Sequence, residues 1–251
     1  MKVIISENAA ELGKKAADLA AGRLREAIEE KGCARMILST GASQFTTLEA
    51  LVQEDVDWSR VEMFHLDEYV NLPQTHPASF VKYLKERFVQ KTGPLKAVHF
   101  VDTSQGTDLI IEKLTAQLRE SPVDVGLIGI GENAHIAFND PPADFENPAS
   151  YLVVNLDEDC RKQQLGEGWF PTLDDVPKQA VSMTVSQILK CRHIISAVPY
   201  QVKAQAIKNT LENEVTNQVP ATVLKTHPDV TVFVDKDSAE TVDQEILERY
   251  L

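Results

Sequence analysis

Residues 123–141 read Val-Asp-Val-Gly-Leu-Ile-Gly-Ile-Gly-Glu-Asn-Ala-His-Ile-Ala-Phe-Asn-Asp-Pro. The first part, Val123 to Ile130, is a short and nearly continuous apolar run, which is typical of a strand covered on both faces in a parallel sheet. The second part is a loop that carries His135 and Asp140 beside two amide side chains. Because loops on a rigid scaffold commonly carry function, the stretch predicts a buried parallel strand with a functional loop at its exit.

Similar apolar runs alternate with helical patterns along the rest of the chain. The other expected strands are Lys2–Ser6, Arg35–Ser39, Val61–Asp67, Ala97–Val101, His193–Val198 and Val230–Asp235. The expected helices are Ala9–Glu30, Ser43–Val52, Ser79–Val89, Asp108–Glu120, Thr184–Leu189, Gln201–Leu211 and Ser238–Tyr250. This alternation predicts an α/β fold, a single domain over residues 1–251 with a doubly wound, mainly parallel, Rossmann-like sheet flanked by helices. Ligands of such sheets bind beyond the carboxyl ends of the strands.

A long segment from about Pro141 to Gln179 follows neither pattern. It mixes chain-breaking prolines and glycines with large aromatic residues, among them Trp169 and Phe170. A loop of this length within a compact domain is often a lid or a wall of the substrate site. We therefore expect a lid-like irregular region here, with a surface excursion packed by the two aromatic side chains as the alternative.

The bulk composition argues against several classes of partner. The net charge of −13 opposes non-specific binding to nucleic acid or to anionic lipid. No apolar run reaches the length of about 18 residues that spans a bilayer, and the N-terminal run is too short for a signal peptide, so a cytoplasmic protein is expected. The three cysteines are widely spaced and the six histidines form no cluster with ligand spacing, so neither a disulfide framework nor a metal site is indicated.

Two strand exits suggest a site for an anion. Thr40-Gly41-Ala42-Ser43 is a turn of small residues, in which backbone N–H groups and hydroxyls can approach a phosphate. Lys203 lies in the first turn of an expected helix, where a cation is unfavourable to the helix dipole unless an anionic ligand offsets it. The turn lacks the Gly-Lys-Ser/Thr of a P-loop, so a nucleoside triphosphate is not implied. The alternatives are an ordinary capped turn and a surface lysine.

A third exit carries two adjacent carboxylates, Asp67 and Glu68. On an extended backbone Asp67 shares a face with His65, while Glu68 shares the opposite face with Leu66. One carboxylate can therefore face a cleft while its neighbour has a structural role, and Asp67 is the better candidate for a base. The alternative is a helix cap or a solvated acidic turn.

The loop of residues 129–141 supplies the fourth exit. His135 and Asp140 are best explained as an acid/base pair, because an imidazole near its own pKa can take and give a proton at neutral pH; a structural histidine is the alternative. Residues 129–134 also match the Gly-x-Gly-x-x-Gly/Ala fingerprint of dinucleotide sites. That fingerprint requires a helix to begin at once, whereas Pro141-Pro142 breaks any helix here, so a dinucleotide is disfavoured.

Taken together, these segments resemble the glucosamine-6-phosphate deaminase (isomerase) family, within the superfamily that also contains the 6-phosphogluconolactonases. The resemblance covers nearly the whole chain and is more specific than any one motif. It lies in the segments Thr40-Gly41, Leu66-Asp-Glu-Tyr69, Gly129 to Pro141, Val176-Pro-Lys178 and Lys203-Ala204. The run His135-Ile-Ala-Phe-Asn139 favours the deaminase branch.

The resemblance implies conversion of glucosamine 6-phosphate to fructose 6-phosphate and ammonia, without a metal or redox cofactor. Asp67 is similar to the base that moves a proton between C2 and C1 of the opened sugar, and His135 to the group that assists ring opening. Two further groups of residues take roles by position. Substrate contacts are implied for Glu68, Gly131 and Ala134, and phosphate contacts for Thr40, Gly41, Ala42, Ser43, Lys203 and, by a loose alignment, Arg161.

Four positions depart from the family pattern. Asp140 stands where Glu is usual and Asn133 where Asp is frequent, while Ala42 and Ala134 replace glycines. Asn133 hydrogen-bonds but does not stabilise an imidazolium by charge, so the proton affinity of His135 depends more on Asp140 or Glu132. Asp140 also reaches about 1.5 Å less far than Glu, and placement errors of about 1 Å matter to catalysis.

Three rival functions follow from the same residues. A 6-phosphogluconolactonase uses the same histidine toward water, and a catalytically inactive sugar-phosphate-binding module keeps the pocket without turnover. A dinucleotide-dependent oxidoreductase is the third. The expected partner is a small sugar phosphate, and the expected state is a monomer or small homo-oligomer. The chain ends soon after the last expected helix, which favours an unregulated enzyme.

Overall fold

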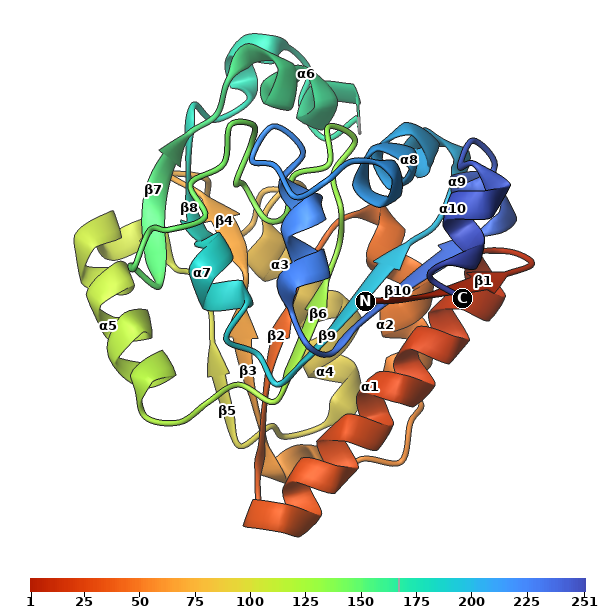
Figure 1. The fold of residues 1–251 in the computed structure, drawn as a ribbon. Helices are drawn as coiled ribbons and strands as arrows, with labels where there is room; N and C mark the ends of the chain where they lie inside the picture. The colour runs from red at the N-terminus through yellow and green to blue at the C-terminus, as the bar shows by residue number, and fades with distance from the viewer. Residues whose placement is uncertain (167) are drawn as a thin grey trace.

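A seven-stranded parallel sheet forms the frame of the protein in a computed structural model that describes residues 1–166 and 168–251 (Figure 1). The strand order is β1-β10-β9-β6-β2-β3-β5, and every pairing within it is parallel. The strands are β1 (Lys2–Ser6), β2 (Ala34–Leu38), β3 (Val61–His65), β5 (Ala97–His99), β6 (Val125–Ile128), β9 (His193–Val198) and β10 (Val230–Asp235). The predicted fold class, a doubly wound parallel sheet, is confirmed.

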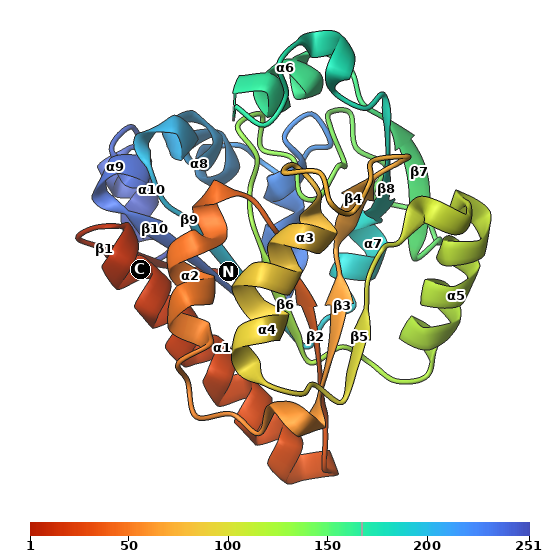
Figure 2. The same ribbon diagram turned by 180° about the vertical axis from the view of Figure 1, so that it is seen from behind.

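Helices cover both faces of this sheet and enclose two separate apolar clusters (Figures 1 and 2). One face is covered by α1 (Ala9–Lys31), α2 (Phe45–Leu51), α3 (Phe80–Leu84), a π-helical turn (Lys85–Val89) and α4 (Gln90–Thr92). The other is covered by α5 (Thr107–Arg119), α7 (Val185–Ile188), α8 (Ala204–Glu212), α9 (Lys236–Ala239) and α10 (Gln244–Glu248). No helix among the described residues is long and apolar enough to cross a membrane.

The longest helix, α1, shows why the sequence folds this way locally. Asn8 precedes it in an extended conformation, and its side chain accepts a hydrogen bond from the N–H of Glu11 at 3.0 Å. The buried face is lined mainly by alanine, which has the highest helix propensity and allows the helix to lie close to the sheet. Gly32 ends the helix at φ 81°, a left-handed conformation that glycine adopts without strain.

A second, three-stranded antiparallel sheet stands beyond the carboxyl edge of the main sheet, with α6 (Glu158–Gly166) above it (Figure 1). Its order is β4-β8-β7, formed by β4 (Asp67–Tyr69), β8 (Gln179–Met183) and β7 (Tyr151–Asn155). The segment 141–179 was expected to be irregular, and the structure corrects this, because it contains β7 and α6. The helix expected over 238–250 is likewise two short helices, α9 and α10.

Leu66 joins the two sheets. Its N–H donates to the carbonyl of Leu38 in the main sheet at 3.2 Å, and its own carbonyl accepts from the N–H of Met183 in β8 at 3.0 Å. The strand expected to run from 61 to 67 therefore divides here into β3 and β4. Asp67, the first residue of β4, lies directly at this junction.

The strand order also fixes where a ligand fits. From β2 the chain builds outward through β3 to β5, and it then returns to β6, the other neighbour of β2, and builds in the opposite direction. The crevice at such a reversal is where open α/β sheets bind ligands, on the carboxyl side of the strands. The loops after β2 and β6, residues 39–43 and 129–135, leave the sheet at this point.

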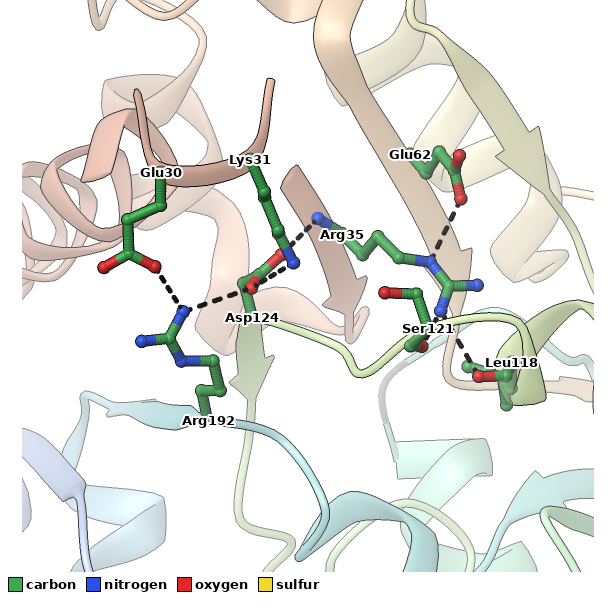
Figure 3. Close-up of polar contacts among 8 residues, drawn as sticks. All are labelled: Glu30, Lys31, Arg35, Glu62, Leu118, Ser121, Asp124 and Arg192. Atoms are coloured by element: carbon green, nitrogen blue, oxygen red, sulfur yellow. Dashed lines mark hydrogen bonds and ion pairs between the residues drawn. The ribbon is translucent and has the colours of Figure 1, made fainter. Parts of the chain in front are cut away.

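The opposite, amino-terminal edge of the sheet is closed by a network of charged side chains (Figure 3). Asp124, 1% exposed, accepts from the ammonium of Lys31 at 2.7 Å and from the backbone N–H of Arg35 at 2.8 Å. Arg35 in turn pairs with Glu62 at 3.1 Å and donates to carbonyl oxygens at the end of α5 and beyond it. The network ties α1, β2, β3 and the start of β6 together by charge-assisted hydrogen bonds.

Candidate functional site

A pocket opens at the carboxyl ends of β2, β3, β6 and β9. Four segments distant in sequence line it, namely residues 39–43, 66–67, 129–132 with His135, and 200–203. Phe80, Phe138 and two glutamines of α6 complete the wall. The structure thus brings Thr40, Gly41, Ala42, Ser43, Asp67, Gly131, His135 and Lys203 into one cavity.

The turn after β2 forms one end of the pocket. Gly41 has φ 102° and ψ 163°, a conformation that L side chains rarely adopt, and its carbonyl accepts from the hydroxyl of Tyr83 at 2.9 Å. Ser39 is 6% exposed, and its hydroxyl has no hydrogen-bond partner among the residues that the structure describes. A buried hydroxyl without a partner is unfavourable unless a ligand satisfies it, so this end of the pocket suits an anion or a polar group.

Lys203 reaches the same pocket from the segment after β9. Its side chain is buried to 8% exposure, within the short 3₁₀ helix Gln201–Lys203. Tyr200, which precedes this helix, has φ 80°, and its N–H donates to the carboxylate of Asp235 at 3.1 Å. A non-glycine residue held in this region is strained, and such strain clusters at functional sites.

Asp67 forms the floor of the pocket. It is 6% exposed, and among the described residues no group donates a hydrogen bond to its carboxylate. Burial, aided by the negative charge of Glu68, raises the pKa of Asp67 to about 8. A carboxyl group with this pKa is a much stronger base than a solvated aspartate, which matches the requirement for a general base near neutral pH.

Glu68 has a structural role, which corrects the expectation that it contacts substrate. It does not line the pocket, and its side chain points to the start of α3, where it accepts from the hydroxyl of Ser79 at 2.9 Å and the N–H of Val81 at 2.8 Å. Burial raises the pKa of Glu68 although these donors lower it. The alternation of side chains along β4 places the neighbouring carboxylates on opposite faces.

His135 stands beside Asp67 with Asp140 behind it. The Nδ1 atom of His135 lies 2.8 Å from Oδ1 of Asp140, and the same oxygen accepts from the side-chain amide of Asn133 at 2.9 Å. Burial raises the pKa of Asp140, but hydrogen bonds from His135, Asn133 and Cys160 outweigh burial and hold this pKa below its usual value. Because an ionised carboxylate only accepts, the contact requires a proton on Nδ1 of His135.

Asn133 and Ala134 shape this loop without lining the pocket. The side-chain oxygen of Asn133 accepts from the backbone N–H of His135 at 3.0 Å, so the residue fixes both members of the pair. Ala134 has φ 65° and is fully buried, which makes it a strained turn position and not a substrate contact.

Gly131 is required by the position of the imidazole. A Cβ atom placed on Gly131 would lie 2.2 Å from Nε2 of His135, far inside van der Waals contact. The N–H of Gly131 also donates to the carbonyl of His135 at 2.9 Å, so the loop closes on itself around the ring. Any side chain here displaces the histidine.

The structure does not bring Arg161 to the pocket. Its guanidinium donates to the backbone carbonyl of Leu173, and Arg161 is not among the residues that line the cavity. The residues of α6 that do line the pocket are Gln163 and Gln164, which were not predicted. Ser39 and Tyr200 also line the pocket and were not predicted. Both follow the carboxyl end of a strand, which is where ligands of such sheets bind.

The described residues contain no group of three or more His, Cys, Asp or Glu side chains placed to hold a metal ion. The fold and the pocket define an α/β protein of the open parallel-sheet class with a site at its topological switch point. The chain belongs to the family described as glucosamine-6-phosphate isomerases/6-phosphogluconolactonase, whose model matches residues 7–233.

Relatives in this family share close to full length with the chain. The glucosamine-6-phosphate deaminase of Lactobacillus delbrueckii subsp. bulgaricus is 36% identical over 241 residues, covering 95% of this chain and 98% of the relative. That of Halothermothrix orenii is 35% identical, with 95% and 99% covered. The solved structure of a monomeric glucosamine-6-phosphate deaminase superposes with a TM-score of 0.85 at 29% identity, over 96% of this chain and 99% of that one. A 6-phosphogluconolactonase from Thermotoga maritima shares the fold, with a TM-score of 0.77 at 18% identity.

Proposed function

We propose that this protein isomerises and deaminates an amino-sugar phosphate, converting glucosamine 6-phosphate to fructose 6-phosphate and ammonia. One observation carries the proposal: a buried aspartate with a pKa near 8 shares a single cavity with a carboxylate-held histidine and an anion-binding turn. The names of full-length relatives support the same reaction.

The first step opens the sugar ring. In this proposal the Nε2 atom of His135 accepts the proton of the C1 hydroxyl and returns it to the ring oxygen, which breaks the C1–O5 bond and leaves an aldehyde at C1. Asp140 holds the ring nitrogen opposite and stabilises the imidazolium that forms in between. His135 thus carries one proton from the C1 hydroxyl to the ring oxygen.

The second step moves hydrogen from C2 to C1. The C2 proton of the open aldehyde is acidified by the adjacent carbonyl, so the Asp67 carboxylate removes it. O1 takes up a proton given up by the ammonium group at C2, and an enolamine forms. The protonated Asp67 then delivers the proton to C1, which leaves an imine at C2. Water adds to this imine and ammonia leaves, which gives the C2 ketone. Neither step requires a metal or a redox cofactor.

The phosphate would bind at the opposite end, between the backbone N–H groups of residues 40–43 and the side chain of Lys203. The unpartnered hydroxyl of Ser39 is a further donor there. Fixing the charged end of an open six-carbon chain holds C1 and C2 against Asp67, which turns binding energy into orientation. We infer a monomer or a small homo-oligomer, in line with the monomeric structural relative.

The test is incubation of the purified protein with glucosamine 6-phosphate, with ammonia and fructose 6-phosphate measured separately. Equal amounts of the two products support the proposal, and Asp67→Asn should abolish both. Hydrolysis of 6-phosphogluconolactone with no ammonia release would instead identify a lactonase. Binding of sugar phosphate without turnover would identify a sensing module.

A further inference from the structure

The inner face of α6 forms a wall of the pocket to which the mechanism above assigns no role. Cys160, Gln163 and Gln164 share this face, because residues three and four apart lie side by side on a helix. Cys160 is 1% exposed and hydrogen-bonds Asp140, so the face lies over the half of the pocket that holds His135. Both glutamines line the cavity.

This wall offers amides and no positive charge. The two cations of α6 are engaged elsewhere, Arg161 at the carbonyl of Leu173 and Lys162 at Glu158, 2.7 Å away. The phosphate end of the pocket is built by residues 39–43 and Lys203, on other elements. A neutral amide wall suits the uncharged hydroxyl groups of a sugar chain.

Gln164 is held in one orientation. The hydroxyl of Tyr69 donates to its side-chain oxygen, and the ring of Tyr69 is packed among Phe80, Phe138 and Phe170 with centroids 4.9, 5.5 and 5.7 Å away. Tyr69 is 1% exposed and Gln164 6% exposed. Because the amide oxygen is taken up by Tyr69 and Gln164 lines the cavity, the NH₂ group is the part of this side chain that remains to donate to a ligand there.

We propose that Gln164 determines which sugar the site accepts, by donating hydrogen bonds to the hydroxyls at C3 and C4 of the amino-sugar phosphate. Tyr69 is the positioning residue that keeps the amide turned toward them. The inference rests on the proposed function, in which C1 and C2 react at Asp67 and C6 carries the phosphate. An epimer that moves a hydroxyl away leaves the buried amide unpaired, and this penalty discriminates against it.

The experiment compares kcat/KM for glucosamine 6-phosphate and galactosamine 6-phosphate, which differ only at C4. The wild-type protein should favour one of them. Gln164→Met, which keeps the size of the side chain and removes the donors, should lower kcat/KM for the favoured epimer by about 10–100-fold and reduce the ratio between epimers by about tenfold. Gln205→Met, on an exposed position of α8, is the matched control and should change neither value.

Tyr69→Phe separates positioning from packing. It removes one oxygen and should reduce the epimer ratio in the same direction as Gln164→Met, but to a smaller extent. In the double variant it should cause no further change in the ratio, because the amide it orients is gone. Thermal unfolding of each variant identifies any that fail to fold, and the ratio is then taken from Tyr69→Phe alone.

Three results would overturn the inference. These are a wild-type protein that does not distinguish the epimers, a folded Gln164→Met variant with an unchanged ratio, and additive effects of the two substitutions on the ratio. If the wild-type protein releases ammonia from neither sugar, the proposed function itself fails and the inference falls with it. Ammonia release with an unchanged ratio rejects the role of Gln164 alone.

Discussion

The two edges of the central sheet carry buried carboxylates in opposite circumstances. At the amino-terminal edge Asp124 accepts from Lys31 and from the backbone of Arg35, so its charge is fully compensated (Figure 3). At the carboxyl edge Asp67 is buried to a similar extent, yet no described residue donates to it, and its pKa rises to about 8. An aspartate thus serves stability at one edge and, in the proposed function, reactivity at the other.

The contrast extends to the neighbours of each carboxylate. The carboxyl edge also contains the unpartnered hydroxyl of Ser39 and the left-handed residues Ala134 and Tyr200. Unsatisfied polar groups and backbone strain both reduce stability, and they persist where the surrounding structure enforces them. The amino-terminal edge, with its closed network, provides part of that enforcement. The protein thus keeps the stabilising charge network and the pocket at opposite ends of its strands.

The largest expected effect comes from removing the reactive carboxylate. Asp67→Asn keeps the shape of the side chain but abolishes the base, so the rate of ammonia release should fall by about 10³–10⁴-fold, the upper range for a general base. The variant should remain folded. Circular dichroism and the product assay check both statements, and Asp55→Asn, on an exposed loop, is the control. An Asp67→Asn variant with a tenth of normal activity would show that the base lies elsewhere.

The next largest effect is expected at the opposite edge. Asp124→Ala leaves Lys31 and the N–H of Arg35 without their acceptor, so the free energy of unfolding should decrease by about 3–5 kcal/mol. Urea denaturation measures the change, and kcat per folded molecule should stay constant because the network is remote from the pocket. Glu30→Gln, at the exposed rim of the network, should have little effect. Equal losses in the two variants would show that Asp124 has no special role.

A smaller effect should follow when His135 is displaced without being replaced. In Gly131→Ala the added methyl group would lie 2.2 Å from Nε2 of His135, so the imidazole ring must shift. Activity should therefore fall by about 100-fold. Gly22→Ala is the matched control, since nothing lies within 4 Å of the added atom, and it should leave activity unchanged. Steady-state kinetics and thermal unfolding of both variants test the expectation. Full activity in Gly131→Ala would mean that the loop is free to adjust.

The last prediction concerns the dependence of the free energy of unfolding on pH. Because burial raises the pKa of Asp67 to about 8 in the folded protein from an ordinary value of 3.8, the folded protein holds a proton between these values that the unfolded chain has released. The stability that this bound proton provides is complete below pH 3.8 and is lost as pH rises through about 8. The free energy of unfolding falls by at most about 1.4 kcal/mol per pH unit. Asp67→Asn lacks the loss, so its stability relative to wild type should increase from pH 5 to pH 8. A constant difference would refute the raised pKa.

Much of the central sheet could be predicted from the sequence, because a parallel strand buried on both faces leaves a near-continuous apolar run. The limits of β9 and β10 match the predicted runs to the residue. The small antiparallel sheet could not be predicted, because β7 and β8 lie in a segment rich in prolines and charges, and β4 pairs with a strand more than a hundred residues away. Pairing over that distance leaves no local pattern in the sequence.

The candidate site divides in the same way. Asp67, His135 and Lys203 were predicted because strand exits of a parallel sheet converge at one edge, and this rule requires no side-chain detail. Glu68 and Arg161 were assigned to the pocket by resemblance, but neither lines it. Strand alternation directs Glu68 to the start of α3, and the guanidinium of Arg161 bonds the carbonyl of Leu173. Gln164 was not predicted, because its side chain is oriented by a hydrogen bond from Tyr69, 95 positions earlier in the chain.

The junction at Leu66 has a consequence for how this architecture can change over time. The backbone of one residue is anchored to both sheets, through Leu38 on one side and Met183 on the other, so the aspartate that follows it is positioned by main-chain bonds alone. Helix α6 lies between β7 and β8 of the small sheet in the sequence, and it contributes the side chains of Gln163 and Gln164 to the pocket. Substitutions in that wall can therefore change which substrates fit while the proposed proton-transfer residue Asp67 keeps its position.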